Sequence, residues 1–186
     1  MAYFPLFVDL KDKNILIVGG GKIAERKIDV LLQFLPKITV ITEEIKSERI
    51  KELYKKDKIK LELRQFDIED LKDRDLVIVA VGNIPLQEKI YRECVKRKIP
   101  VNSVDSLDFC SFIFPAIVKE DDIVIGISTS GKAPALASKL KEIIRDCLPK
   151  NLKSVLKDMV RLRESLPKGR ERQKILINFL KKRLKD

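Results

Sequence analysis

Histidine is absent from the 186-residue sequence, and this absence excludes several classes of enzyme site. Ser-His-Asp hydrolysis, Cys-His proteolysis and histidine-bound zinc all require an imidazole ring. Any general base must therefore come from Asp, Glu, Lys, Tyr or Cys. Cysteine is scarce as well, because Cys94, Cys110 and Cys147 are widely spaced and form no CxxC pair. This pattern favours reduced, mostly buried thiols over a metal or redox motif.

Long apolar runs are also missing. No stretch approaches the roughly 18 residues that span a bilayer, and the start Met1–Pro5 lacks the charged and apolar regions of a signal peptide. We therefore expect a cytoplasmic protein with no membrane partner. Hydrophobic residues make up 45% of the chain and charged residues 36%, which is typical of a globular protein with a charged surface.

The net charge of +11 is unevenly distributed along the chain. Residues 149–186 contain 13 Lys and Arg against four Asp and Glu, so the preceding residues are nearly balanced. A basic segment of this kind is suited to nucleic acid, an anionic membrane or an acidic small molecule. A solvated helix face explains the same charges without any ligand, and the composition does not choose between these readings.

Alternating apolar runs and helical periodicities predict the fold. Residues 14–18 form a short apolar run that ends at three glycines, which suits a strand buried on both faces. Helical spacing follows up to Pro36, and a second strand is expected over residues 38–42. The alternation continues with a helix over 45–55, strands over 59–64 and 76–80, a helix over 85–97 and a strand over 99–102. This order predicts an α/β protein with a Rossmann-like parallel sheet.

Beyond Asp105 the pattern changes. Two apolar strands, over residues 112–118 and 123–128, are expected to form a hairpin, and helices follow over 133–147, 152–166 and 170–184. We therefore expect a Rossmann domain over residues 1–112, a central segment over 113–148 and a small basic helical domain over 149–186.

The glycine-rich segment after the first strand carries the most specific chemistry. It fits G-x-G-x-x-A and opens a helix, as a dinucleotide-binding turn must. Gly19 allows the tight turn, Gly21 lets the backbone approach a pyrophosphate, and small Ala24 lets the helix pack closely. The candidate cofactor-binding residues are Gly19, Gly20, Gly21, Lys22, Ile23 and Ala24.

Two acidic residues follow the second strand. An acid about 20 positions after the glycines normally holds the ribose hydroxyls, and Glu43 and Glu44 occupy this place. A carboxylate here repels a 2′-phosphate, so the sequence favours NAD over NADP. The alternative is that both acids only open the next helix, where negative charge favours the N-terminal dipole.

Polar residues gather after the strand at 99–102, namely Asn102, Ser103, Asp105, Ser106 and Asp108. The carboxyl ends of parallel strands are where open α/β sheets bind ligands, so these are site candidates. A turn rich in Asp and Ser is the alternative.

A second polar loop, residues 128–134, joins a predicted strand to a predicted helix. Its hydroxyls, backbone amides and Lys132 resemble an anion cradle, although the spacing of a Walker loop is missing. Ser128, Thr129 and Lys132 are the candidate ligand-binding residues. Helix capping is the alternative explanation.

Five motifs together resemble the precorrin-2 dehydrogenase/sirohydrochlorin ferrochelatase family, which includes the N-terminal part of bacterial sirohaem synthase. They are Phe4–Phe7, Val18–Lys27, Val101–Asp105, Ser111–Ala116 and Ile127–Ala137, and they occur in the family's order over nearly the whole chain. The resemblance implies an NAD-binding Rossmann domain, a central segment that forms an intertwined homodimer, and a small helical C-terminal domain. Residues 113–148 then become the dimerisation segment.

The resemblance also implies a reaction, the NAD-dependent oxidation of precorrin-2 to sirohydrochlorin. The aspartate of the family's N-x-x-D motif, here Asp105, is implied in dehydrogenation and, in members that insert iron, in chelation. The substrate is a ring with many carboxylates, which the Lys and Arg side chains of the C-terminal helices would attract. Asn102, Ser128, Thr129 and Lys132 are then expected to bind substrate, with no metal ligands. Thr129-Ser130-Gly131 departs from the family's commoner Ser/Thr-Gly-Gly.

Two other functions remain as alternatives. A dehydrogenase of another small metabolite would share the glycine turn but not the later motifs. A redox-sensing regulator would combine NAD binding with a basic DNA-binding tail. However, no helix-turn-helix pattern precedes the glycines, and Phe179 is the tail's lone aromatic residue. We expect no nucleic-acid partner and, because no methyltransferase domain follows, no methylation of uroporphyrinogen III.

Overall fold

A computed structural model describes residues 3–184, which form two compact units that divide between Phe114 and Pro115. The first two residues of the start Met1–Pro5 and the last two of the basic segment 149–186 lie outside the described residues. No helix within residues 3–184 has both the length and the apolar character needed to cross a membrane.

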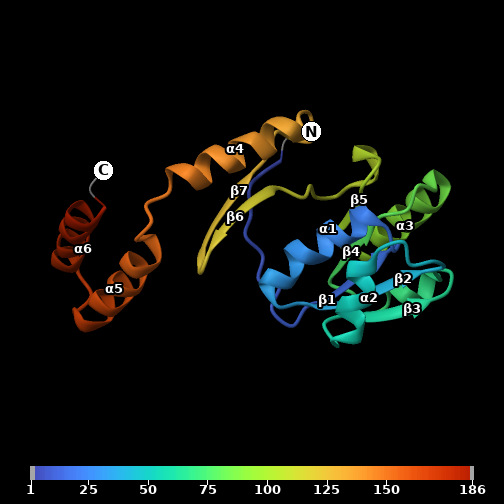
Figure 1. Cartoon of the computed structure of the whole chain (residues 1–186), viewed down its shortest axis with the longest axis horizontal. Coiled ribbons are helices and arrows are strands. Elements are labelled where there is room, and N and C mark those ends of the chain that lie inside the picture. The colour runs from blue at the N-terminus through green and yellow to red at the C-terminus, as the bar shows by residue number, and fades with distance from the viewer. Residues whose placement is uncertain (1–2, 185–186) are drawn as a thin grey trace. The chain divides into compact units, whose positions relative to one another are not determined.

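The first unit is built on a five-stranded sheet whose paired strands all run parallel (Figure 1). The strand order is β3-β2-β1-β4-β5. The strands are β1 (Asn14–Val18), β2 (Lys37–Thr42), β3 (Lys60–Leu63), β4 (Leu76–Val79) and β5 (Val101–Ser103). The predicted Rossmann-like fold class is confirmed.

Helices cover both faces of this sheet, which explains why β1 is an uninterrupted apolar run. Ile15, Leu16 and Ile17 are all 0% exposed, although their side chains alternate between the two faces. Helices α1 (Lys22–Leu31) and α2 (Glu48–Lys55) pack on the face that includes Ile15 and Ile17. Helix α3 (Ile84–Arg97) packs on the opposite face, against Leu16.

The helix after the glycine turn is shorter than its periodicity predicts. α1 ends at Leu31, and the apolar spacing that continues to Leu35 belongs to the 3₁₀ turn η1 (Leu32–Phe34). Leu35 then adopts a left-handed backbone with φ 57°, so the chain turns before Pro36 and enters β2. Two further 3₁₀ turns are η2 (Ile68–Leu71) and η3 (Leu107–Phe109).

The second unit begins with the predicted hairpin. Strands β6 (Ala116–Glu120) and β7 (Ile123–Ile127) pair antiparallel, and helix α4 (Pro134–Cys147) packs on them. Helices α5 (Leu152–Ser165) and α6 (Arg170–Arg183) follow and pair with each other. The Arg183 guanidinium donates to Asp158 across this pair at 2.6 Å.

The first strand of the hairpin starts at Ala116, four residues later than predicted from the apolar run at Phe112. The preceding residues are held beside β5 instead. Ser111 exchanges backbone and side-chain hydrogen bonds with Val101, and the Asn102 amide donates to the Phe112 carbonyl at 3.1 Å. An apolar run marks burial, but it does not say which partner provides it.

Candidate functional site

The site of the first unit lies where the strand order reverses. The chain moves from β1 outward to β2 and β3, then returns to β4 on the other side of β1. In open parallel sheets this reversal separates the loops at the carboxyl ends of two neighbouring strands, and ligands bind in the resulting crevice. The loops here are the glycine turn after β1 and the segment after β4, with the segment after β5 beside them.

The first two glycines of the turn are required by the fold, because a side chain at either position would clash with backbone atoms of the same chain. Gly19 has φ 117°, a conformation that favours glycine, and a Cβ there would overlap the Ala80 carbonyl oxygen. A Cβ on Gly20 would lie 2.8 Å from the Glu44 carbonyl oxygen. The Gly19 N–H donates to the Ile41 carbonyl at 2.8 Å, which ties the turn to the end of β2.

The third glycine is different, because a Cβ built on Gly21 meets no atom of residues 3–184 within 4 Å. Packing of the described residues therefore does not explain glycine at this position. The space beside the backbone is a cradle that a side chain would fill, as expected where a pyrophosphate approaches closely.

The amino end of α1 completes this cradle. Gly21 is the N-cap and offers no side chain, and the first helical bond runs from the Glu25 N–H to the Gly21 carbonyl at 3.0 Å. The N–H groups of Lys22, Ile23 and Ala24 therefore precede the helical ladder. Ala24 is 0% exposed, which lets α1 pack closely on the sheet. These donors and the helix dipole fit an anionic pyrophosphate.

The loop after β2 carries the two predicted ribose acids beside the glycine turn. The Lys46 N–H donates to the Gly20 carbonyl at 3.0 Å, and the Thr42 hydroxyl donates to the Glu44 carbonyl at 2.7 Å. Glu43 and Glu44 are both exposed. Glu44 pairs with Lys46 at 3.4 Å, and within residues 3–184 Glu43 has no such ion pair.

These acids do not open the next helix. α2 begins at Glu48, later than the predicted residue 45, and its N-cap is Ser47, whose hydroxyl accepts from the Ile50 N–H at 3.1 Å. The same hydroxyl donates to Glu25 of α1 at 2.6 Å. The alternative explanation of Glu43 and Glu44 as helix-opening residues is therefore wrong.

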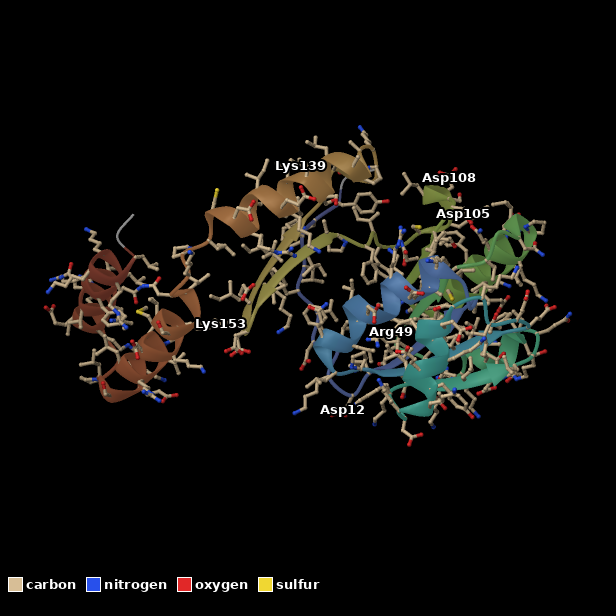
Figure 2. The ribbon with its side chains drawn as sticks, in the orientation of Figure 1. Asp12, Arg49, Asp105, Asp108, Lys139 and Lys153 are labelled. Carbon is tan, nitrogen blue, oxygen red and sulfur yellow. The ribbon has the colours of Figure 1, made fainter. Side chains whose placement is uncertain are left out.

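Asp105 lies just beyond β5 and is exposed, and Figure 2 shows it near Asp108 in the segment after that strand. One carboxylate oxygen of Asp105 accepts from the side-chain amide of Gln87 at 3.2 Å. Asp108 lies in η3 and is also exposed. A carboxylate that is both accessible and held by a neighbour can take a proton from a bound molecule.

Asn102 and Ser103 lie within β5 and are buried, so they are not part of an exposed turn. The Asn102 amide donates to the Phe112 carbonyl, and the Ser103 N–H donates to the Cys110 sulfur at 3.2 Å. Burial raises the pKa of the Cys110 thiol, so this sulfur is neutral near pH 7. Asn102 thus orders the segment after β5, and its Oδ1 has no hydrogen-bond partner among the described residues.

The polar loop of the second unit, between β7 and α4, is closed by its own hydroxyls. Ser128 Oγ accepts from the Ser130 N–H at 2.9 Å, and Thr129 Oγ1 accepts from the Ala133 N–H at 3.1 Å. Ser130 has φ 55°, the left-handed region that favours glycine. Lys132 is exposed, and Ala133, the N-cap of α4, makes no side-chain capping bond. The hydroxyls stabilise the loop rather than cap the helix.

The family described as putative NAD(P)-binding matches residues 6–116. The chain belongs to this NAD(P)-binding family. The predicted nicotinamide dinucleotide cofactor is thereby confirmed at the level of NAD(P). A second family, described as sirohaem biosynthesis protein central, matches residues 123–146.

Curated relatives agree with the motif resemblance. A sirohaem synthase of Buchnera aphidicola is 37% identical over 183 residues, covering 98% of this chain and 37% of the relative. A sirohaem synthase of Baumannia cicadellinicola is 42% identical over 149 residues, covering 80% of this chain and 32% of the relative. The chain thus spans about a third of the length of these relatives. The predicted relationship to sirohaem synthases is confirmed.

A solved structure shares the fold. SirC, a precorrin-2 dehydrogenase, superposes with a TM-score of 0.78 at 24% identity, covering 98% of this chain and 93% of that chain. At this identity the likeness supports the architecture of the NAD(P)-binding unit and the helices that follow it.

The structure also contains site residues that the sequence analysis missed. Gln87 is buried and donates to Asp105, whereas Lys27 is partly buried over the Phe114 ring, and neither was predicted as a site residue. Gln87 shares one helical stripe with buried Ile90 and Cys94, three and seven residues on, so its spacing was a usable signal. Among residues 3–184, no group of three Cys, Asp or Glu side chains is arranged to hold a metal ion.

Proposed function

We propose that the protein oxidises precorrin-2 to sirohydrochlorin with NAD⁺. The observation that carries the proposal is the position of Asp105, an accessible carboxylate at the carboxyl end of β5, one strand beyond the β1/β4 reversal. The names of the relatives, sirohaem synthase and precorrin-2 dehydrogenase, support this substrate. The family match over residues 123–146 supports the same pathway, and the match over residues 6–116 supports the cofactor.

Removing two hydrogen atoms from the macrocycle requires a hydride acceptor and a proton acceptor. NAD⁺, when bound, supplies the hydride acceptor. The protein binds the pyrophosphate at the N–H groups of the first turn of α1 and keeps Gly21 clear of it. Hydride leaves one C–H bond of the ring with both electrons, Asp105 takes the proton that leaves a second position, and the electron pair left behind forms the new double bond. The chain offers no histidine for this step.

NAD is proposed over NADP because of the loop after β2. Glu43 lies beside the glycine turn without an ion-pair partner within residues 3–184, so its carboxylate is available to the ribose hydroxyls. A 2′-phosphate at the same place would meet this negative charge at short range.

The basic helices α5 and α6 are proposed to attract the carboxylates of the macrocycle. An open hollow of ≈ 570 Å³ lies where these helices meet, and the described residues that line it include Arg163, Lys168 and Arg172 together with Glu164. Attraction of this kind is long-ranged and weakens with salt, because the Debye length is about 8 Å at 0.15 M ionic strength. Ser128, Thr129, Lys132 and Asn102 stay proposed substrate-binding residues.

We also propose a homodimer formed through residues 113–148. The hairpin β6–β7 buries Val118 and Ile127 against α4, whereas α4 leaves Leu136 and Ile143 53% and 47% exposed. A second copy would cover such apolar positions. Light scattering at micromolar concentration should give twice the mass of one chain, and a monomer would contradict the proposal.

The reaction is tested directly with purified protein, precorrin-2 and NAD⁺. The absorption spectrum should change to that of sirohydrochlorin while NADH appears in equal amount. A parallel sample with sirohydrochlorin and Fe²⁺ measures iron insertion separately. Tight, salt-sensitive DNA binding without any turnover would instead favour an NAD-reading regulator.

A further inference from the structure

Gln87 joins the two loops that form the catalytic edge of the first unit. Its side-chain nitrogen donates to the Val81 carbonyl at 2.6 Å and to the Asp105 carboxylate at 3.2 Å. Val81 belongs to the loop after β4, and Asp105 to the loop after β5. One side chain from α3 therefore connects the loop nearest the reversal of strand order with the proposed base.

The orientation of this amide follows from its surroundings. Both partners, a carbonyl and a carboxylate, are acceptors, so they require the NH₂ end of the amide and would repel the oxygen end. The two N–H groups of the amide match the two acceptors, and exchanging the amide nitrogen and oxygen would lose both hydrogen bonds.

The side-chain oxygen of Gln87 lowers the stability of the fold. Gln87 is 0% exposed, and its Oε1 has no hydrogen-bond partner among residues 3–184. A buried polar atom without a partner destabilises a fold. An apolar residue of similar length would continue the stripe of Ile90 and Cys94 and remove this cost. Core packing alone therefore does not account for glutamine, whereas the two contacts made by its nitrogen do.

We propose that Gln87 is a positioning residue that fixes the Asp105 carboxylate for proton removal by holding the loops after β4 and β5 together. This inference rests on the proposed function, because it assumes that Asp105 is the base. Gln87 itself is buried and acts only through Asp105. Solvent alone would leave an exposed carboxylate free to rotate, and proton transfer depends on the distance of the carboxylate from the proton that it removes.

The test replaces Gln87 with Met, which keeps the length of the side chain and removes both donors. A second variant, Gln87→Glu, keeps the shape, but burial beside the Asp105 carboxylate raises the pKa of the new carboxyl, whose protonated form donates one hydrogen bond in place of two. The matched control is Gln33→Met, since among residues 3–184 the exposed Gln33 amide donates only to the nearby Asp29 carbonyl, at 3.2 Å. All variants are made in the full chain and compared in kinetics and in hydrogen exchange.

Both Gln87 variants should lower kcat for precorrin-2 oxidation by about 10- to 100-fold, the range for losing a hydrogen bond to a charged group. KM for NAD⁺ should change less than about twofold, and amides of residues 104–109 should exchange faster. In an Asp105→Asn background, Gln87→Met should add almost nothing, because the two residues act as one unit. Gln33→Met should match the wild type throughout.

Two results would overturn the inference. One is a Gln87→Met effect that multiplies with that of Asp105→Asn, since independent residues behave additively in free energy. The other is unchanged exchange over residues 104–109, which would show that Gln87 does not anchor the loop. The exchange measurement needs no turnover, so it decides the anchoring role even if Asp105→Asn keeps full activity and the proposed base is wrong.

Discussion

The Lys27 ammonium of α1 lies 3.9 Å from the centroid of the Phe114 ring. Burial lowers the pKa of Lys27 from 10.5 to about 8, and the negative charge of Cys110 in its thiolate form opposes this shift. Within residues 3–184, no carboxylate forms an ion pair with Lys27. A cation held mainly by an aromatic face is less well solvated than in water, because a ring replaces only part of the lost hydration.

Lys27→Met should therefore stabilise the protein at pH 7. Because the folded-state pKa lies below that of the unfolded chain, the charged ammonium destabilises the fold at every pH below about 8. As the pH rises from about 8 to about 10.5, the folded protein loses this proton first and the penalty disappears. The gain at pH 7 should be about 1 to 3 kcal/mol, the lower value allowing for partial solvent access.

Urea unfolding at several pH values between 7 and 10 measures this gain. The free energy of unfolding of the Lys27→Met variant should exceed that of the wild type at pH 7, and the two should converge toward pH 10. The buried thiol of Cys94 lowers the stability of both proteins as the pH rises above 9. Burial raises its pKa to about 12, so the thiol ionises in the unfolded chain before it ionises in the folded protein. Only the difference between the two proteins is diagnostic, and a constant difference would contradict the assigned cause.

Gly21→Ala should separate cofactor binding from folding. A Cβ at this position meets no described atom within 4 Å, and the poorer N-capping by alanine opposes the entropic gain of replacing glycine, so stability should change by less than about 1 kcal/mol. NAD⁺ affinity should fall by at least about tenfold, because the methyl group occupies the space of the pyrophosphate. Calorimetry measures the affinity, and thermal unfolding measures the stability.

Gly19→Ala is the matched comparison. Its Cβ would overlap the Ala80 carbonyl oxygen in a left-handed backbone, so this variant should lose more than about 1 kcal/mol of stability. If Gly21→Ala instead unfolded like Gly19→Ala, the third glycine would serve the fold and not the ligand.

Glu43 should decide the choice between the two dinucleotides. The wild type should bind NAD⁺ more tightly than NADP⁺, and Glu43→Gln should narrow the ratio of the two dissociation constants by about tenfold through loss of the repelling charge. Glu44→Gln is the control, since its carboxylate is paired with Lys46 at 3.4 Å. Equal binding of both dinucleotides by the wild type would refute the role of Glu43.

The sheet and the glycine turn were predictable because local patterns determine them. A buried apolar run, three glycines and a helical stripe specify the turn after β1 without any distant contact. The start of β6 was not predictable in this way, since Phe112 and Phe114 are as apolar as the strand residues that follow. That segment is held beside β5 because the Ser111 hydroxyl accepts from the Val101 N–H and the Asn102 amide donates to the Phe112 carbonyl. Each pair is ten residues apart, and one partner in each is a backbone group, which the residue type does not reveal.

In the candidate site too, one residue was predictable from the sequence and its partner was not. Asp105 was identified from its place after a parallel strand and from a motif, both of which are readable in the sequence. The partner that orients it was not identified, because a glutamine in a charged amphipathic helix is usually solvated. Burial of Gln87 arises from the packing of α3 on the sheet, and only the structure shows that its amide meets two acceptors there.

Asp105→Asn tests the proposed base. The variant keeps the size of the side chain and can still accept the Gln87 amide through its oxygen, so the fold and NAD⁺ affinity should match the wild type. Removing the basic charge should lower the single-turnover rate of oxidation by about 10² to 10⁴, the range for losing a general base. Asp108→Asn is the control, because this exposed neighbour in η3 follows the same strand and should cost much less. If Asp105→Asn kept a near-normal single-turnover rate, Asp105 would orient substrate or shape the loop, and the proton would leave directly to water.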